Sequence, residues 1–263
     1  MITAVARGLG GRPKKLPSWL FYDKAGDAIF QQIMRMAEYY PTRCEYDILE
    51  RHKDDLLGHF ISPGSSFRLV ELGAGDGLKT EILLRHFLAS GANFTYFPVD
   101  ISVNVLEQLS GWLLDRHPSL KIQPLNQTYD EALEGIGMEP GRKILLFMGA
   151  NIGNFSTADA AAFMKKLASH LIPGDMLLLG MDLKKDPRII HEAYDDPHGL
   201  TRSFNLNLLT RLNRELGARF ITADFSHYPS FDPETGTMKS FLISMKEQSV
   251  RIDALRRLVH FDA

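Results

Sequence analysis

The chain has 263 residues, 44% of them hydrophobic and 24% charged, which is enough to bury the core of one large domain or of a domain with a companion and excludes a disordered or fibrous protein. Thirty basic residues against 32 acidic ones give a net charge of −2 with no long basic run, so we expect no nucleic-acid partner. The single cysteine excludes an intramolecular disulfide framework, and no stretch approaches the roughly 18 apolar residues of a membrane span, so we expect a cytoplasmic protein without a membrane partner.

Helices are predicted for the first part of the chain. Apolar residues recur at three- and four-residue spacing over residues 26–36 and again over residues 45–60. Pro41 lies between these stretches, in the string EYYPTR, and is expected to separate the two helices.

From residue 67 the pattern changes to strands that alternate with helices. Strands are predicted at residues 67–72, 94–100, 120–125, 143–149 and 175–183. Helices are predicted at residues 79–90, 103–116 and 157–171, the last with Ser156 or Thr157 as its N-cap. Near-continuous apolar strands between helices predict an α/β fold with a doubly wound, mostly parallel sheet that is covered on both faces.

The last part of the chain does not continue this alternation. Helices are predicted at residues 189–194 and 203–216, followed by strands at 218–228 and 237–247 that form a hairpin around residues 229–236. This region could extend the sheet in antiparallel fashion or form a separate lobe with the N-terminal helices. We expect a mixture of the two, giving a second, smaller α+β domain.

A glycine-rich turn follows the first strand of the α/β region. The string VELGAGDGLKT places Glu71 before three glycines at alternate positions, Gly73, Gly75 and Gly77. Backbone approaches a nucleotide at this turn in α/β folds, but a dinucleotide site has the spacing G-x-G-x-x-G, with its third glycine one residue later. The early glycine and the acidic Glu71 favour a cationic ligand over a pyrophosphate, which disfavours an NAD-dependent oxidoreductase.

Asp100 ends the second strand of the region, where a carboxylate can accept hydrogen bonds from both hydroxyls of a ribose. The alternative is that the glycine turn is only a tight connection and that Asp100 caps the next helix. The order of strand, turn, helix, strand and acidic residue favours cofactor binding.

The turn resembles motif I of the class I S-adenosylmethionine methyltransferases. Further strings extend the likeness over most of the chain: FYDKAGDAIFQQI, EYYPTRCEYDIL, GANIGNF, MDLKKDPRIIHEAYDD and FNLNLLTRLNRELGA. Together they resemble the histidine-specific Nα-methyltransferases of ergothioneine biosynthesis. That resemblance implies a monomeric enzyme that uses S-adenosylmethionine to convert free histidine to trimethylhistidine (hercynine).

The resemblance also implies site residues and domains. Cofactor contacts are expected from Glu71, Gly73, Gly75, Gly77, Lys79, Asp100, Thr128 and Tyr129, with Lys79 as the partner of the cofactor's carboxylate. The amino acid is expected at Tyr22, Tyr39, Gly149, Asn154 and Tyr194, with Asn154 and Tyr39 as the catalytic, orienting pair. Residues 1–60 are expected to contribute helices to a substrate domain, residues 61–185 to form the methyltransferase core, and residues 186–263 to form the C-terminal substrate-binding region.

Two departures from the family pattern affect these expectations. Thr128 stands where the family has Asp, so one charged contact near the adenine is expected to be missing. The chain ends at Ala263, where the family continues into a segment whose Glu and Ser bind the imidazole, so we expect a truncated form. The alternatives are a different substrate, either another amino acid or an alkaloid-type amine, and a catalytically impaired protein that only binds cofactor.

The string HEAYDDPH raises the question of a metal site. It contains His191, Glu192, Asp195, Asp196 and His198. On a helix His191 and Asp195 would share a face, but the spacing sets no third ligand, so we expect a solvated helix end and no metal. The sequence shows no recognisable Ser-His-Asp or Cys-His arrangement for nucleophilic catalysis.

Overall fold

The structure, a computed structural model, describes residues 1–61, 65–137 and 141–263. Its contacts divide the chain into two units, which are named here the core unit (residues 41–183) and the second unit (residues 1–40 and 184–263). No helix within the described ranges is long and apolar enough to cross a membrane.

The core unit is built on a five-stranded sheet with the strand order β3-β2-β1-β4-β5, all parallel. The strands are β1 (Ser66–Leu72), β2 (Asn93–Asp100), β3 (Leu125–Asn126), β4 (Arg142–Phe147) and β5 (Met176–Leu179). The chain reverses its direction of travel across the sheet after β3, so β1 and β4 are neighbours at the point where the carboxyl ends of an open parallel sheet bind ligands.

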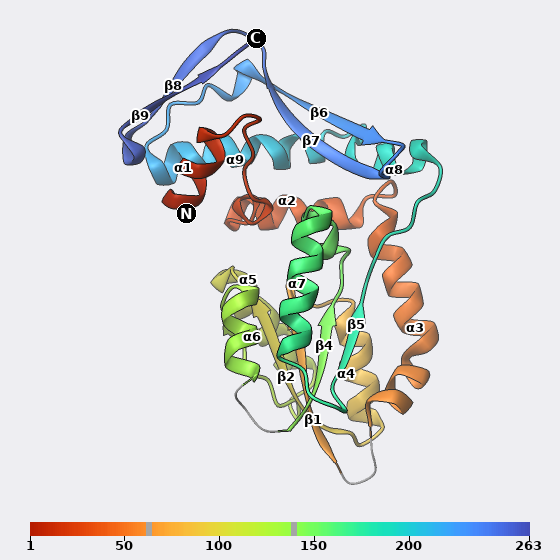
Figure 1. The fold of residues 1–263 in the computed structure, drawn as a ribbon. Helices are drawn as coiled ribbons and strands as arrows, with labels where there is room; N and C mark the ends of the chain where they lie inside the picture. The colour runs from red at the N-terminus through yellow and green to blue at the C-terminus, as the bar shows by residue number, and fades with distance from the viewer. Residues whose placement is uncertain (62–64, 138–140) are drawn as a thin grey trace. The chain divides into compact units, whose positions relative to one another are not determined.

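Helices lie on both sides of this sheet (Figure 1). They are α3 (Tyr40–Phe60), α4 (Thr80–Ala89), α5 (Val103–Arg116), α6 (Tyr129–Gly137), the 3₁₀-helix η2 (Asn151–Asn154) and α7 (Thr157–Ser169). Ser102 and Ser156 cap α5 and α7, each accepting a hydrogen bond from a backbone N–H in the first turn.

Successive side chains along each strand point to opposite faces of the sheet, and both faces are covered by helices. Leu69 and Tyr96 face the side on which α3, α4 and α5 pack, whereas their neighbours Val70 and Phe97 face α6 and α7. All four side chains are buried, as expected for a parallel sheet with two covered faces. The predicted doubly wound α/β fold is therefore confirmed.

The second unit combines helices with two small antiparallel sheets. Its elements are α1 (Ile2–Gly10), η1 (Ser18–Phe21), α2 (Lys24–Arg35), α8 (Pro187–Tyr194), α9 (Leu200–Leu216), η3 (Thr222–Asp224), β6 (Phe225–Asp232), β7 (Thr237–Ser244), β8 (Gln248–Ile252), η4 (Asp253–Leu255) and β9 (Arg257–Phe261). β6 pairs with β7, and β8 pairs with β9. Apolar residues of α1, α9 and β8, among them Val5, Leu212 and Ile252, form a core of their own.

Several boundaries differ from the sequence predictions. Pro41 lies in the first turn of α3, where a missing N–H costs nothing, rather than between two helices. The strand predicted at residues 120–125 is reduced to Leu125–Asn126, and the one predicted to begin at residue 218 begins at Phe225. The hairpin β6–β7 forms its own sheet and does not extend the five-stranded one.

The division of the chain lies at the first residue of α3, between Tyr40 and Pro41, whereas the sequence prediction placed it at residue 60. Leu49, Leu57 and Phe60 of α3 pack into the same cluster as β1 and α4, which is why this helix groups with the sheet. The role of the second unit in binding substrate stays a prediction.

Candidate functional site

The glycine turn between β1 and α4 has a backbone that only glycine adopts readily. Gly73, Gly75 and Gly77 have φ angles of +81°, +56° and +66°. The N–H groups of Gly73 and Ala74 donate to the carbonyl oxygen of Val99 at 2.9 and 3.1 Å, which ties the turn to the end of β2. A Cβ added at Gly75 would meet nothing within 4 Å, so the backbone is open on that side.

Glu71 lies near the end of β1, two residues before the first glycine of the turn, and is buried. Its two carboxylate oxygens accept hydrogen bonds from the hydroxyls of Thr80, at 2.6 Å, and of Tyr96. Burial raises the pKa of Glu71 to about 7, against the lowering effect of these two bonds and of the nearby Lys79. Both oxygens thus have partners inside the protein, so Glu71 links the end of β1 to α4 and β2. Its predicted contact with cofactor stays a prediction.

Asp100 joins the end of β2 to the turn. One carboxylate oxygen accepts from the backbone N–H of Ser102 at 2.9 Å and the other from that of Gly75 at 3.2 Å. Burial raises its pKa even though these hydrogen bonds lower it. The backbone of Ile101 also donates to this carboxylate, and because a carboxylate has about four acceptor positions it can still accept from a ribose hydroxyl.

Lys79 lies where the turn passes into α4, and its ammonium pairs with the carboxylate of Glu45 on α3. The backbone N–H of Gly149, after β4, donates to both oxygens of the same carboxylate, at 2.7 and 2.9 Å. One ammonium and one N–H therefore converge on a single carboxylate at this edge of the sheet.

Thr128 and Tyr129 begin α6. The backbone N–H and the hydroxyl of Thr128 both donate to Glu131, at 2.8 Å each, as a cap of their own helix. The Tyr129 ring packs against Phe147, with ring centroids 5.4 Å apart, and its hydroxyl would lie 2.6 Å from a Cβ placed on Gly73. Burial raises the pKa of Tyr129, so its hydroxyl borders the turn in the protonated form.

Gly149 precedes η2 by two residues, and Asn154 is the last residue of η2. Gly149 has a φ angle of +72°, and Asn154 is exposed. Asn151, which the sequence did not single out, donates its amide to the carbonyl oxygen of Met148 at 2.8 Å and would lie 3.0 Å from a Cβ on Gly73. Of the two amides, Asn151 borders the glycine turn and Asn154 is open to solvent.

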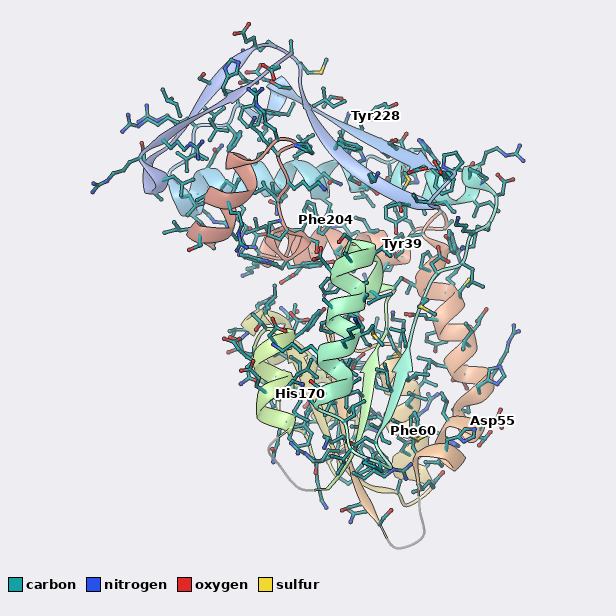
Figure 2. The ribbon with its side chains drawn as sticks, in the orientation of Figure 1. Tyr39, Asp55, Phe60, His170, Phe204 and Tyr228 are labelled. Atoms are coloured by element: carbon teal, nitrogen blue, oxygen red, sulfur yellow. The ribbon has the colours of Figure 1, made fainter. Side chains whose placement is uncertain are left out.

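The three predicted tyrosines belong to one aromatic cluster in the second unit. Tyr39 and Tyr194 pack edge to face with ring centroids 6.2 Å apart, and Phe30 contacts Tyr39 at 6.2 Å and Tyr22 at 5.6 Å. Phe204 completes the cluster and lies near Tyr39 in Figure 2. All three tyrosines are half-buried, so each combines a packed ring with partial access to solvent.

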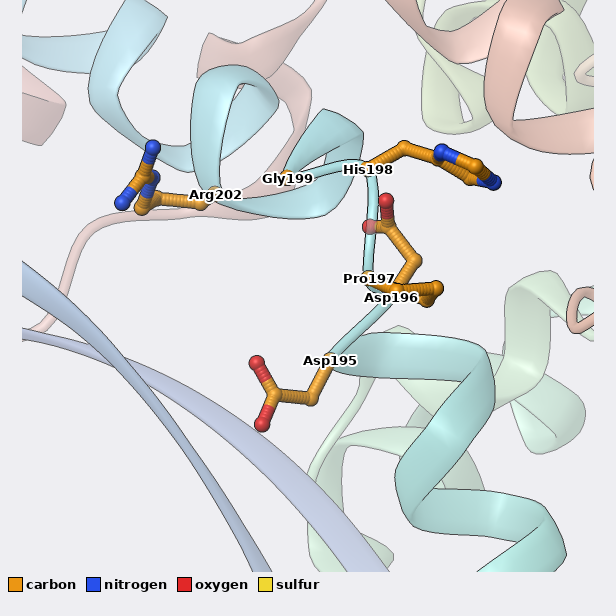
Figure 3. Close-up of a pocket in the computed structure, with 6 residues that line it drawn as sticks. All are labelled: Asp195, Asp196, Pro197, His198, Gly199 and Arg202. Atoms are coloured by element: carbon orange, nitrogen blue, oxygen red, sulfur yellow. The ribbon is translucent and has the colours of Figure 1, made fainter.

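The segment after α8 forms a hollow in the second unit. The hollow is lined by Asp195, Asp196, Pro197, His198, Gly199 and Arg202, whose charged side chains diverge in Figure 3. Both oxygens of Asp196 accept from the first turn of α9, at the N–H groups of Leu200 and Thr201. In the described parts of the chain, no three His, Cys, Asp or Glu side chains are grouped to hold a metal ion.

The core-unit residues fit a ligand that carries a carboxylate and a ribose. Lys79 and the Gly149 N–H supply donors for a carboxylate, Asp100 supplies acceptors for hydroxyls, and Gly75, which donates to Asp100, has open space where a side chain would be. These are the polar groups that S-adenosylmethionine requires, so the residues present fit that cofactor.

Glu45 is not among the predicted site residues, although the string EYYPTRCEYDIL contains it. A signal was present, because Glu45 precedes the buried Leu49 by four residues and so lies on the apolar face of α3. Phe30 and Phe204 carried no comparable signal, since an aromatic residue on the apolar face of a helix is usual.

The chain is similar to known proteins along most or all of its length. A family model described as histidine-specific, SAM-dependent methyltransferase matches residues 1–263. Histidine N-alpha-methyltransferase of Mycolicibacterium smegmatis is 37% identical over 259 residues, 98% of this chain and 79% of that protein. Ergothioneine biosynthesis protein 1 of Schizosaccharomyces pombe is 30% identical over 90% of this chain, which spans 31% of that protein. 4-Dimethylallyltryptophan N-methyltransferase easF of Claviceps fusiformis is 32% identical over 72% of this chain and 56% of that protein.

Proposed function

Since the chain belongs to the family of histidine-specific, SAM-dependent methyltransferases, we propose that it methylates the α-amine of free histidine. The observation that carries this proposal is the match of the family model to all 263 residues. The 37% identity to the histidine N-alpha-methyltransferase of Mycolicibacterium smegmatis supports it. Ergothioneine biosynthesis is the process in which we place the reaction.

The cofactor is S-adenosylmethionine, and it would be held by the core unit. Asp100 would accept its ribose hydroxyls, Lys79 would pair with its carboxylate, and Gly75 would leave room for it because it carries no side chain. When bound, the cofactor supplies a methyl group that is activated by the sulfonium. Tyr129 would border the adenine side through its hydroxyl, and Thr128 would contribute through the cap that it forms on α6.

The protein's task in such a transfer is positioning. The α-amine of a peptide has a reference pKa of about 8, and the adjacent carboxylate of a free amino acid raises that pKa, so the site must also allow the ammonium to lose its proton before transfer. The amine lone pair must lie about 3 to 3.5 Å from the methyl carbon and in line with the bond that breaks. We assign this orientation to Asn154, whose amide can donate to a carboxylate and accept from an amine, and to Tyr39. Tyr22, Tyr194 and Gly149 would shape the rest of the amino-acid site.

A second candidate acceptor is an indole-derived amine. The N-methyltransferase of Claviceps fusiformis, named for 4-dimethylallyltryptophan, shares 32% identity with this chain. The aromatic cluster of the second unit would accommodate an indole as well as an imidazole. The match over the full chain favours histidine.

Two measurements on the full chain test the proposal. Isothermal titration with S-adenosylhomocysteine and, separately, with NAD identifies the cofactor class, and we expect only the former to bind. Mass spectrometry of histidine incubated with S-adenosylmethionine should then show products that grow by one CH₂ for each transfer. Binding without a product from histidine, but with one from tryptophan-type amines, would favour the second candidate. Cofactor binding with no product from either would indicate a protein that only binds cofactor.

Asn154 offers a residue-level test of the orienting role. Replacing it by Ala should lower kcat/KM for histidine by roughly 10- to 100-fold, the cost of about 1.5–3 kcal/mol for a hydrogen bond to a charged group. Asn154→Asp keeps the shape but cannot donate to the substrate's carboxylate, so it should be at least as impaired. Affinity for S-adenosylhomocysteine serves as the control and should stay constant. Unchanged turnover and unchanged histidine affinity in Asn154→Ala would remove Asn154 from the site.

A further inference from the structure

Glu45 holds the two donors that the cofactor's carboxylate is expected to use. Its carboxylate pairs with the ammonium of Lys79 and accepts from the N–H of Gly149 at 2.7 and 2.9 Å. The side chains of Glu45 and Lys79 are each only 17% exposed. In this partly desolvated place a charged hydrogen bond is stronger than at the surface.

The backbone around Glu45 is shaped to receive a carboxylate. A Cβ on Gly180, just after β5, would lie 2.2 Å from an oxygen of Glu45, and a Cβ on Gly149 would lie 3.7 Å from the Lys79 nitrogen. Any larger residue at position 180 would meet the carboxylate. Glu45 therefore sits against bare backbone at the carboxyl ends of β4 and β5, which is where an α/β sheet binds its ligand.

Two carboxylates cannot use these donors equally well at the same time. A second carboxylate at Lys79 would meet the negative charge of Glu45, and the single N–H of Gly149 is already shared between both oxygens of Glu45. Binding of one carboxylate therefore opposes binding of the other.

We propose that Glu45 is an internal competitor for the carboxylate-binding position, which Lys79 and the Gly149 N–H form, and that it must release Lys79 when the cofactor's carboxylate binds. This inference rests on the proposed contact between Lys79 and that carboxylate. Glu45 thereby lowers the affinity for any ligand with the amino-acid end and leaves ligands without it unaffected. The affinity difference between such ligands therefore depends on one functional group, the carboxylate of the amino-acid end.

The test compares two ligands on the full chain by isothermal titration. S-adenosylhomocysteine has the amino-acid end, and 5′-methylthioadenosine has the same nucleoside and thioether without it. In Glu45→Gln the neutral amide still accepts from the Gly149 N–H but competes less well for Lys79. We expect this variant to bind S-adenosylhomocysteine about three- to tenfold more tightly, because charged hydrogen bonds are roughly twice as strong as neutral ones. Its affinity for 5′-methylthioadenosine should not change.

Matched variants complete the design. Asp47→Asn removes the same charge from an exposed position on α3 and should leave both affinities unchanged. Lys79→Met should weaken S-adenosylhomocysteine but not 5′-methylthioadenosine. Glu45→Ala, which removes the carboxylate altogether, should strengthen S-adenosylhomocysteine as Glu45→Gln does.

Three results would overturn the inference. Weaker binding of S-adenosylhomocysteine to Glu45→Gln would mean that Glu45 holds Lys79 in place for the ligand. Equal binding would mean that the two carboxylates do not compete. Unchanged binding to Lys79→Met would mean that the ligand does not use this position. These titrations contain no histidine. A negative result for Glu45 would therefore leave the proposed methylation of histidine intact, and failure to methylate histidine would leave the competition at Lys79 intact.

Discussion

Glu71 is a carboxyl group inside the core unit, and burial is the main cause of its pKa of about 7, above the ordinary value of 4.5. Between these two values the folded protein binds a proton that the unfolded chain has released. The free energy of unfolding should therefore fall as pH rises from about 4.5 to about 7, by on the order of 3 kcal/mol. Glu71→Gln, which carries no titrating group, should remove this part of the pH dependence.

Urea unfolding at pH 5 and at pH 8 measures this effect. The wild-type protein should lose more stability between the two pH values than Glu71→Gln does. Tyr96→Phe is an informative companion, because it deletes a hydrogen bond that lowers the pKa of Glu71 and should extend the loss to higher pH. Equal pH dependence in wild type and Glu71→Gln would contradict the raised pKa.

The site residues that can be predicted from the sequence are those whose position follows from the order of strands and turns along the chain. Asp100 and the three turn glycines lie at strand ends, and strand ends in a parallel sheet converge on one edge. The spacing along α3 places Glu45 on the apolar face of that helix, but its partner Gly149 is 104 residues distant in the chain. That contact depends on how α3 packs against β4 and β5, which no local pattern encodes.

The β1–α4 turn distinguishes two glycines that look equivalent in the sequence. Both Gly75 and Gly77 have positive φ angles, so Ala at either position costs roughly 1–2 kcal/mol in backbone strain. At Gly77 a Cβ would also lie 2.2 Å from Cδ1 of the buried Leu109, which adds about 1–3 kcal/mol of overpacking. At Gly75 the added methyl would point into open space, where the cofactor is expected.

The two alanine variants should therefore fail in different ways. Gly77→Ala should lose more stability in urea unfolding, and Gly75→Ala should lose more affinity for S-adenosylhomocysteine relative to its loss of stability. Measuring both quantities on both variants makes each the control for the other. The opposite pattern would place the ligand on the Leu109 side of the turn.

Elements were predicted where their pattern is strong and missed where it is weak. The buried strands β1, β2 and β4 are near-continuous apolar runs, which identify them at once. β8 and β9 have only five residues each, with two buried side chains in β8 (Val250 and Ile252) and one in β9 (Val259), so the alternation along each strand is very short. The helix α6 was missed although Thr128 and Glu131 form a capping box at its start, a signal that the sequence does contain.

At the scale of the whole molecule, the two units have separate cores. Clusters around β1, β2 and β4 stabilise the core unit, and clusters around α9 and α2 stabilise the second unit. The core unit is one continuous stretch of chain, whereas the second unit is made from both ends. Every predicted cofactor residue belongs to the core unit, and the three predicted substrate tyrosines belong to the second.

A fragment of residues 41–183 should consequently fold and bind S-adenosylhomocysteine but transfer no methyl group to histidine. It keeps the five-stranded sheet, both layers of helices, the glycine turn, Lys79, Asp100 and Glu45. Circular dichroism and thermal melting test its folding, and ligand at about 100 times its Kd should stabilise it by about 2.7 kcal/mol if only the folded state binds. Asp100→Ala in the same fragment is the control, because it removes the ribose acceptor and should abolish most of that stabilisation. A folded fragment that does not respond to the ligand would show that cofactor binding requires residues of the second unit.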